Sequence, residues 1–175
     1  AYTAPDAHTL ILDLEYVMDA ALEKLAASGN DQHQPTAASP AVVLVIDELA
    51  ELTSASQARV RRIMSLGRAA SITVIDATQR AHNKLIDTNV RALHHVSIAF
   101  ACRDANESDL LLGDGAAARG FDAGQLDTPG EFYMVGAQSQ PLRCKAYKFD
   151  RDQRTAVAER CPDRRTTTPS TAPYT

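Results

Sequence analysis

The first apolar residues of the chain recur every three or four positions, which predicts an amphipathic helix over residues 3–25. The repeated positions are Leu10, Leu14, Val17, Met18, Ala21, Leu22 and Leu25. Thr3 can cap this helix, Pro5 suits its first turn, and Asp6 is favourable at the positive end of the helix dipole. Gly29 and Asn30 end the helix, and the polar residues 31–40, with two prolines, predict a loop.

Three apolar runs follow, at residues 41–46, 71–77 and 94–101, and each predicts a strand. The first is unbroken and rich in β-branched residues, which is typical of a strand buried on both faces of a parallel sheet. Residues 54–70 mix apolar and arginine side chains at helical spacing, and residues 81–93 suit a loop and a short helix. Strands that alternate with helices predict an α/β fold, with a mainly parallel sheet flanked by helices.

The second half of the chain predicts shorter elements. Residues 104–112 suit a short helix and 116–119 a smaller one, while Gly113, Gly115 and Gly120 are placed to end helices and make turns. Residues 131–135 and 143–149 predict a short antiparallel strand pair near the C-terminus. Charge, Thr, Ser and Pro accumulate after Phe149. We expect one domain over residues 1–150 and a polar, disordered tail over residues 151–175.

Composition limits the possible functions. The 175 residues are 45% hydrophobic and 23% charged, which is ordinary for a globular domain, and the net charge of -4 provides no overall basic field for nucleic acid. The three cysteines, Cys102, Cys144 and Cys161, have no C-x-x-C spacing, which argues against a disulfide framework or a zinc site and favours the cytoplasm. No apolar run is long enough to span a membrane. The start at Ala1, without Met, favours a fragment of a longer protein.

Two strand ends carry the candidate chemistry. Asp47 and Glu48 follow the first strand, and Thr78 and Gln79 follow the second, so a parallel sheet would bring them to the edge where α/β folds bind ligands. This is the set that a nucleotide triphosphatase needs: one carboxylate to hold Mg²⁺ through water, a second to activate the attacking water, and an amide to detect the γ-phosphate. The alternatives are a helix cap for the carboxylates and an ordinary turn for the amide.

Basic residues are harder to interpret. Arg103 follows the third strand and could stabilise transition-state charge on a neighbouring subunit, although pairing with Asp104 or Glu107 is the simpler interpretation. Arg59, Arg61 and Arg62 could contact DNA phosphates, or they could be a solvated helix face. The neighbouring histidines 94 and 95 would point to opposite faces of a strand, which argues against a shared metal.

The phosphate-binding loop G-x-x-x-x-G-K-S/T does not occur. The nearest spacing joins Gly115 to Gly120, but Phe121 and Asp122 stand where the Lys and the hydroxyl belong. We therefore reject this segment as a phosphate loop and expect negligible ATP turnover from the chain alone.

Four segments together resemble the FtsK/SpoIIIE family of hexameric DNA translocases. Residues 43–52 resemble its Walker B segment, 67–80 its next helix, strand and sensor, 111–116 its later glycine segment, and 127–132 its closing strand. Leu-Gly-Asp-Gly at 112–115, followed by Arg119 and Gly120, is most similar to actinobacterial plasmid-transfer proteins. The sequence departs from the family at Glu107-Ser108-Asp109, where Asp-Ser-Arg is usual, and a winged-helix tail is not apparent.

The resemblance implies part of a RecA-like P-loop NTPase core: the C-terminal half of a motor domain, without Walker A. It implies ATP and Mg²⁺ as cofactors, double-stranded DNA as partner, and a hexameric ring, with any membrane contact through segments absent here. Carried over, Asp47 positions Mg²⁺, Thr78 and Gln79 contact the nucleotide, Glu48 activates water, and Arg103 acts in trans, with Arg119 and Arg80 as rivals. Two other hypotheses stay open: a ring ATPase for protein secretion, and a non-catalytic domain that docks on a complete motor subunit.

Overall fold

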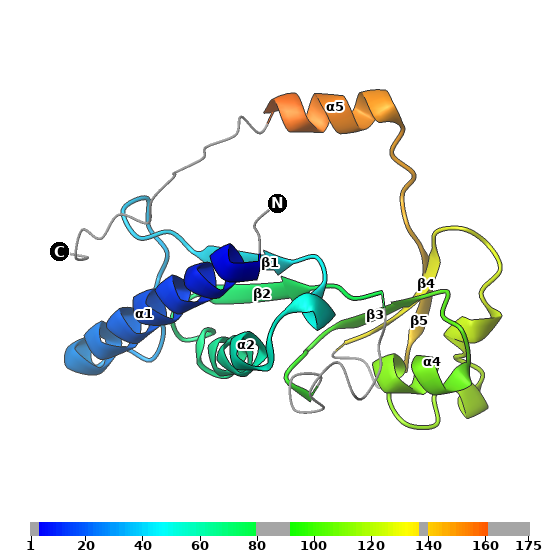
Figure 1. Ribbon diagram of the computed structural model, residues 1–175, viewed down its shortest axis with the longest axis horizontal. Coiled ribbons are helices and arrows are strands. Elements are labelled where there is room, and N and C mark those ends of the chain that lie inside the picture. The colour runs from blue at the N-terminus through cyan, green and yellow to red at the C-terminus, as the bar shows by residue number, and fades with distance from the viewer. Residues whose placement is uncertain (1–3, 80–91, 137–139, 161–175) are drawn as a thin grey trace. The chain divides into compact units, whose positions relative to one another are not determined.

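The computed structural model describes residues 4–79, 92–136 and 140–160 (Figure 1). The chain divides into an N-terminal unit, residues 1–94, and a C-terminal unit, residues 95–175, and each of them has its own sheet and its own core. The expected loop and helix at 81–93 fall almost entirely outside the described residues, as does Arg80.

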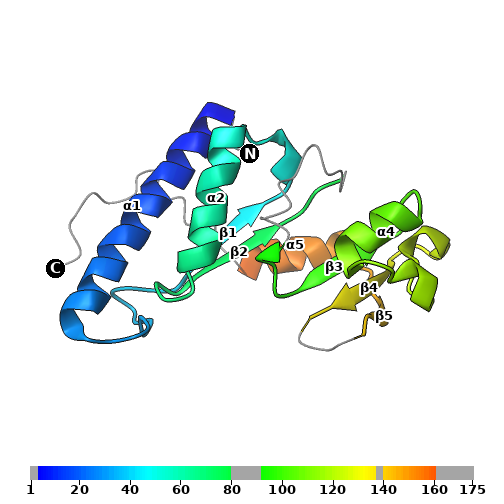
Figure 2. The ribbon, with the colours of Figure 1, turned by 90° about the horizontal axis from the view of Figure 1, so that it is seen from below.

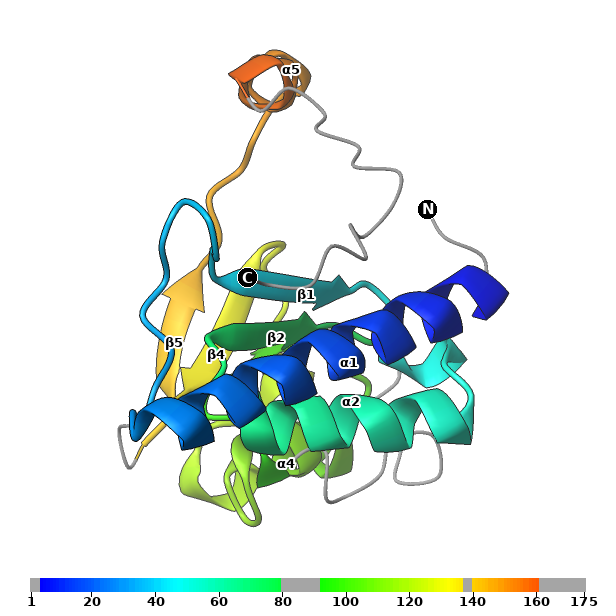
Figure 3. The same ribbon diagram turned by 90° about the vertical axis from the view of Figure 1, so that its left-hand side faces the viewer.

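The N-terminal unit is a two-stranded parallel sheet with two helices on one face (Figure 3). Its elements are α1 (Ala4–Ser28), β1 (Val42–Ile46), α2 (Ser54–Leu66) and β2 (Ile72–Asp76). The boundaries lie close to the predicted ones. The core joins one stripe of each helix to the sheet, through Ile11, Met18, Leu49, Val60, Ile63, Ala70 and Ile72.

Local signals explain where α2 begins and ends. Thr53 caps its start, because the Thr53 hydroxyl accepts a hydrogen bond from the Ser56 amide at 3.2 Å. Gly67 ends the helix. A Cβ on Gly67 would lie 2.5 Å from the carbonyl oxygen of Ile63, so the chain needs a glycine at this close approach.

The sheet of the N-terminal unit is covered on one face only, which differs from the expectation for β1. Val43, Val45 and Ile75 are 56%, 67% and 54% exposed. They alternate along the strands with the inward-facing Leu44 and Val74. We call Val43, Val45 and Ile75 the open face. The unbroken apolar run correctly predicted a strand, but no described element of the N-terminal unit covers its second side.

The C-terminal unit contains an antiparallel sheet in the order β3-β4-β5, covered on one side by helix α4 (Figure 2). These elements are β3 (Ser97–Phe100), β4 (Glu131–Val135), β5 (Leu142–Lys145) and α4 (Ala105–Leu112). The antiparallel pairing of β4 with β5 is as predicted, but β5 is shorter than the predicted strand at 143–149. The third predicted strand differs: it pairs antiparallel with β4 rather than extending the parallel sheet. The core of the C-terminal unit contains Ala99, Leu112, Ala116, Ala123, Leu126 and Tyr133.

The predicted disordered tail begins with a helix instead, α5 (Arg151–Arg160). Asp150 and Gln153 form a reciprocal cap at its start: the Gln153 amide donates to Oδ1 of Asp150 at 2.8 Å, and the Asp150 amide donates to Oε1 of Gln153 at 3.0 Å. All of its side chains are exposed. The composition of this segment suggested disorder because it offers no apolar face to pack. Residues 161–175 lie outside the described part of the chain.

Candidate nucleotide site at the strand ends

Parallel pairing brings the ends of β1 and β2 to one edge of the sheet. Ile46 is in register with Asp76, and the ladder continues one step further, where the Ala77 amide donates to the Ile46 carbonyl at 2.8 Å. The Leu49 amide then donates to the Ala77 carbonyl at 2.9 Å. The predicted meeting of residues 47–48 with residues 78–79 is therefore present in the structure.

Glu48 is the centre of this edge. Its Oε1 accepts hydrogen bonds from the Thr78 hydroxyl at 2.5 Å and, weakly, from the Ala50 amide at 3.4 Å. Its Oε2 accepts a hydrogen bond from the backbone amide of Gln79 at 2.9 Å, which leaves the Gln79 side chain out of this bond. Glu48 also caps a short 3₁₀ turn, Leu49–Glu51, as predicted by the alternative in which the carboxylates cap a helix. One carboxylate thus makes both local and cross-strand bonds.

Asp47 is exposed at the bend between β1 and this turn, so its carboxylate is open to a ligand. Mg²⁺ is usually held by one or two carboxylates together with water and substrate phosphates, rather than by a cage made only of protein. The chemistry of Asp47 fits such an ion. Among the described residues, there is no group of three or more His, Cys, Asp or Glu side chains that could hold a metal ion. Bound Mg²⁺ would draw charge from the phosphate oxygens.

A second polar pair, which was not among the predicted site residues, lies at the end of β2. Nε2 of His94 is 2.5 Å from Oδ2 of Asp76, whose side chain is only 10% exposed. An aspartate inside an apolar strand was a usable signal, since a buried carboxylate needs a partner. This pairing gives His94 a structural role, and His94 precedes β3 instead of lying within it as predicted.

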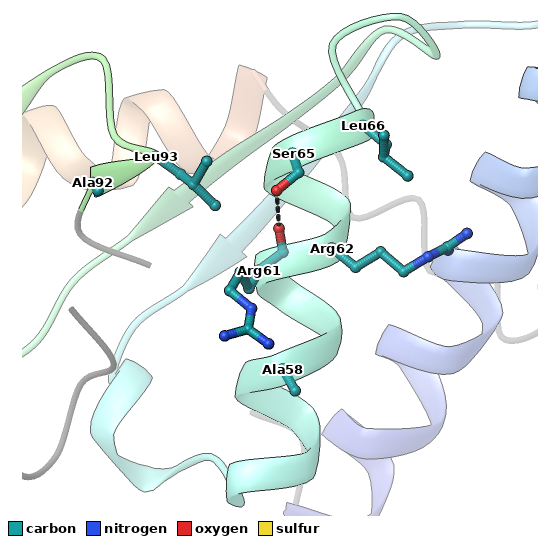
Figure 4. A pocket seen from close by; sticks show the side chains of 7 residues that line it. All are labelled: Ala58, Arg61, Arg62, Ser65, Leu66, Ala92 and Leu93. Atoms are coloured by element: carbon teal, nitrogen blue, oxygen red, sulfur yellow. Dashed lines mark hydrogen bonds between the residues drawn. The ribbon is translucent and has the colours of Figure 1, made fainter. Parts of the chain in front are cut away.

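The three arginines of α2 differ in the direction of their side chains. Arg59 and Arg62 reach α1, where Arg59 pairs with Glu15 and Arg62 pairs with both Glu15 and Asp19. These bonds, first to Asp19 and then to Glu15, raise the pKa of Arg62 above its usual value. Arg61 projects from another side of α2 (Figure 4). The ion pairs between the helices favour a structural role for Arg59 and Arg62.

A hollow beside α2 is distinct from the strand-end site. It is lined by Ala58, Arg61, Arg62, Ser65, Leu66, Ala92 and Leu93 (Figure 4). Asp47, Glu48, Thr78 and Gln79 are not part of its lining. The strand-end site therefore rests on its hydrogen bonds and not on a cavity.

Arg103 and Arg119 lie in the C-terminal unit. Arg103 is 73% exposed, with Asp104 and Glu107 each 3.4 Å away, as the simpler interpretation of this residue predicted. Arg119 donates from Nη1 to the Asp114 carbonyl at 3.0 Å and supports the glycine segment. Neither contact tests a role in trans.

The departure from the family pattern at Asp109 has a structural explanation. Oδ2 of Asp109 accepts from the Gly115 amide at 3.0 Å, and Oδ1 accepts from the Ala117 amide at 2.7 Å. Gly113, Gly115 and Gly120 all have positive φ, as their predicted turn roles require. The carboxylate therefore organises the glycine segment where an arginine is usual.

Comparisons with known proteins show what the chain is similar to. No model of a protein family matches the chain. The DNA translocase FtsK of Bacillus cereus is 31% identical over 124 residues, which are 69% of this chain and 15% of that protein. The FtsK of Oceanobacillus iheyensis is 26% identical over 150 residues, which are 83% of the chain and 18% of that protein. The chain thus spans less than a fifth of the length of these curated relatives.

Two solved structures share the fold. The pCW3 conjugation coupling protein TcpA, in its monomer form with ATPγS, has a TM-score of 0.68 at 19% identity, over 90% of this chain and 49% of that one. The cytoplasmic domain of the type VII secretion ATPase EccC of Thermomonospora curvata has a TM-score of 0.58 at 25% identity, over 81% of this chain and 19% of that one.

These matches define the fold class first: it is α/β, of the RecA-like P-loop NTPase type. The chain belongs, more narrowly, to the FtsK/SpoIIIE-type motor domains. In the described part of the chain, no helix combines the length and the apolar character that a membrane crossing requires.

Proposed function

We propose that the chain is part of an ATP-driven motor that translocates double-stranded DNA. The observation that carries the proposal is the bonding of Glu48 to Thr78 and Gln79 at one sheet edge, because this joins the candidate water-activating carboxylate to the candidate γ-phosphate sensor. The relatives named DNA translocases support the substrate, and the structure of TcpA with ATPγS supports the nucleotide.

Each residue at the edge then has one task. Asp47 would hold Mg²⁺ through water, and Thr78 and Gln79 would contact the terminal phosphate of ATP. Glu48 accepts the proton as the water oxygen bonds to the γ-phosphorus, the bond from that phosphorus to the bridging oxygen breaks, and ADP leaves. The proton then passes from Glu48 to solvent. Positioning and charge stabilisation supply most of the catalysis in this class of reaction.

A phosphate loop from outside this sequence completes the proposed site, since G-x-x-x-x-G-K-S/T is absent here. The open face supports this proposal: Val43, Val45 and Ile75 would be covered by the part of the motor that carries the loop. Subunits assemble into a ring, a hexamer by family resemblance, and Arg103 reaches the phosphates of a neighbouring subunit. Arg119 and Arg80 are the rival residues for this task. The site works on the cytoplasmic side.

Arginines 59, 61 and 62 are the proposed DNA-binding residues in the assembled ring. Arg61 is the better candidate, because it projects from a different side of α2 than Arg62, which reaches toward α1 (Figure 4). Removing one arginine that binds a phosphate should reduce the slope of log affinity against log salt by about 1. Arg61→Ala should lower this slope more than Arg59→Ala, and equal slopes in all variants would remove the three residues from the interface.

Protein secretion is the second candidate function, and the likeness to the EccC ATPase is the observation in its favour. The third candidate is a non-catalytic domain that docks on a complete motor subunit and lends it Arg103. DNA distinguishes the first two, because a DNA motor is stimulated by DNA with a steep dependence on salt.

The deciding experiment measures ATP hydrolysis by the native gene product, whose intact mass is determined first. Turnover that rises with double-stranded DNA and is lost in Glu48→Gln supports the translocase. Turnover that ignores DNA supports the secretion ATPase. A product of 18.9 kDa, the mass of this chain, without turnover supports the docking domain.

A further inference from the structure

Thr78 and Gln79, which follow β2, both donate hydrogen bonds to the side chain of Glu48. The Thr78 hydroxyl donates to Oε1 of Glu48 at 2.5 Å, and the Gln79 amide donates to Oε2 at 2.9 Å. Each carboxylate oxygen therefore has a donor from the segment that also carries the candidate γ-phosphate sensor.

These bonds are of the strong kind. A hydroxyl and an amide that donate to an ionised carboxylate form short, charge-assisted bonds, about twice as strong as neutral ones. Glu48 is also partly buried, so solvent competes less for its oxygens. The Thr78 hydroxyl, 30 residues along the chain, thus fixes the direction of the carboxylate.

We propose that Thr78 is a positioning residue that holds Glu48 against the sensor segment until a γ-phosphate draws that segment away. This inference rests on the proposed function and assigns regulation to the same site. Three donors, the Thr78 hydroxyl and the backbone amides of Ala50 and Gln79, already occupy most of the about four acceptor positions of this carboxylate, so in this arrangement it has little capacity to accept from an attacking water. When the Gln79 side chain binds the γ-phosphate, the segment moves, and Glu48 turns to accept the proton of the water.

The valine variant removes the hydroxyl but keeps the β-branched shape. In the proposed motor, Thr78→Val should raise the kcat for ATP hydrolysis without DNA about tenfold, because one charge-assisted bond no longer holds Glu48. Turnover with DNA should change less, so the ratio of stimulated to basal kcat falls. Thr78→Ser keeps a hydroxyl and should retain the wild-type ratio. A purely structural role for Thr78 would lower both rates together.

The control variant is Thr73→Val, the same substitution at an exposed position within β2. It should leave the ratio of stimulated to basal kcat unchanged. A lower ratio in Thr78→Val alone supports the proposal. A Thr78→Val variant that keeps the wild-type ratio, or loses both rates in parallel, overturns it.

Amide hydrogen exchange tests the same bonds in the 175-residue chain without any turnover. The Gln79 amide should exchange about tenfold faster in Glu48→Ala and in Thr78→Val than in the wild type, whereas Thr73→Val should not change it. The Ala77 amide, bonded to the Ile46 carbonyl, is the internal reference. Equal Gln79 exchange in all variants overturns the proposal. A native gene product that lacks ATP turnover would instead contradict the proposed function, so the two failures are distinguishable.

Discussion

The Gln79 amide donates a 2.9 Å hydrogen bond to Oε2 of Glu48, which links residues that lie 31 positions apart in the sequence. The bond forms because β1 and β2 run parallel, with Ile46 opposite Asp76, so both strands end at one edge. A carboxylate and an amide-bearing residue that are held this way can respond to the same phosphate.

The Glu48→Gln substitution tests the role of this carboxylate. In the proposed motor, turnover should fall at least about a hundredfold, because the attacking water loses its base. ATP should remain bound, since the amide keeps nearly the shape of the acid. Phosphate release and retained nucleotide measure the two effects. Glu51→Gln, in the same 3₁₀ turn, is the control and should leave turnover unchanged.

Ser108 is the polar residue on which the packing of α4 depends. Its fully buried hydroxyl donates to the Phe121 carbonyl at 3.2 Å and accepts from the Ala123 amide at 2.9 Å. Ser108→Ala should lower the free energy of unfolding by about 1–3 kcal/mol, because buried backbone groups lose their partner. Urea denaturation followed by circular dichroism measures the loss. The exposed Ser65→Ala should cost less than about 0.5 kcal/mol, and equal losses would refute this account.

Asp104 should make stability depend on pH. Its Oδ1 accepts bonds from the amides of Asn106 and Glu107 at the start of α4, each at 3.0 Å. The bond from Glu107 and then the interaction with Arg103 lower the pKa of Asp104 from its usual value. A carboxyl with a lowered folded-state pKa contributes stability above its unfolded pKa, and this stability is lost as pH falls through the folded pKa.

The Asp104→Asn variant tests this linkage. Asn still caps the helix but carries no charge, so the decline in stability below about pH 4 should become shallower. Urea midpoints measured from neutral to acidic pH give the comparison. Asp114→Asn, at an exposed position of the same unit, is the control. An unchanged acid decline in Asp104→Asn would contradict the prediction.

The pair of Arg59 and Glu15 should stabilise the packing of α1 on α2. Glu15 is only 12% exposed, although Arg59 is 38% exposed, so the coupling energy of the pair should be about 0.5–1 kcal/mol. A double-mutant cycle with Arg59→Ala and Glu15→Gln measures this energy in urea denaturation. Arg68→Ala, an exposed arginine after α2, should have almost no effect. Additive single substitutions would show that the two residues do not interact.

The sequence predicted elements better than their pairing. The bounds of β1 and α2 followed from local apolar spacing and from Thr53, the cap of α2. The antiparallel partner of β3 could not be foreseen, because an apolar run shows that a strand is buried and not which strand lies beside it. The open face escaped prediction for a related reason: the apolar run at β1 suits a strand with two covered faces, and the described elements of the N-terminal unit cover only one.

The candidate site shows the same limit. Asp47, Glu48 and Gln79 could be chosen because chemistry-bearing residues at strand ends stand out in a sequence. The hydrogen bond from Thr78 to Glu48 could not be chosen, since it depends on side-chain directions between residues 30 positions apart. Asp76 signals that a buried carboxylate needs a partner, but the sequence does not show that this partner is His94, 18 positions away. Similarly, the ion pairs of Arg59 and Arg62 depend on how α1 crosses α2.

The open face also affects the self-association of the chain in solution. Val43, Val45 and Ile75 present a flat apolar surface on a two-stranded sheet, which other copies of the chain can bind through their own apolar surfaces. Light scattering should therefore increase with protein concentration, and a dye such as ANS should fluoresce with the folded chain. Val45→Lys, on the exposed side of β1, should reduce both signals and improve the yield of purified protein.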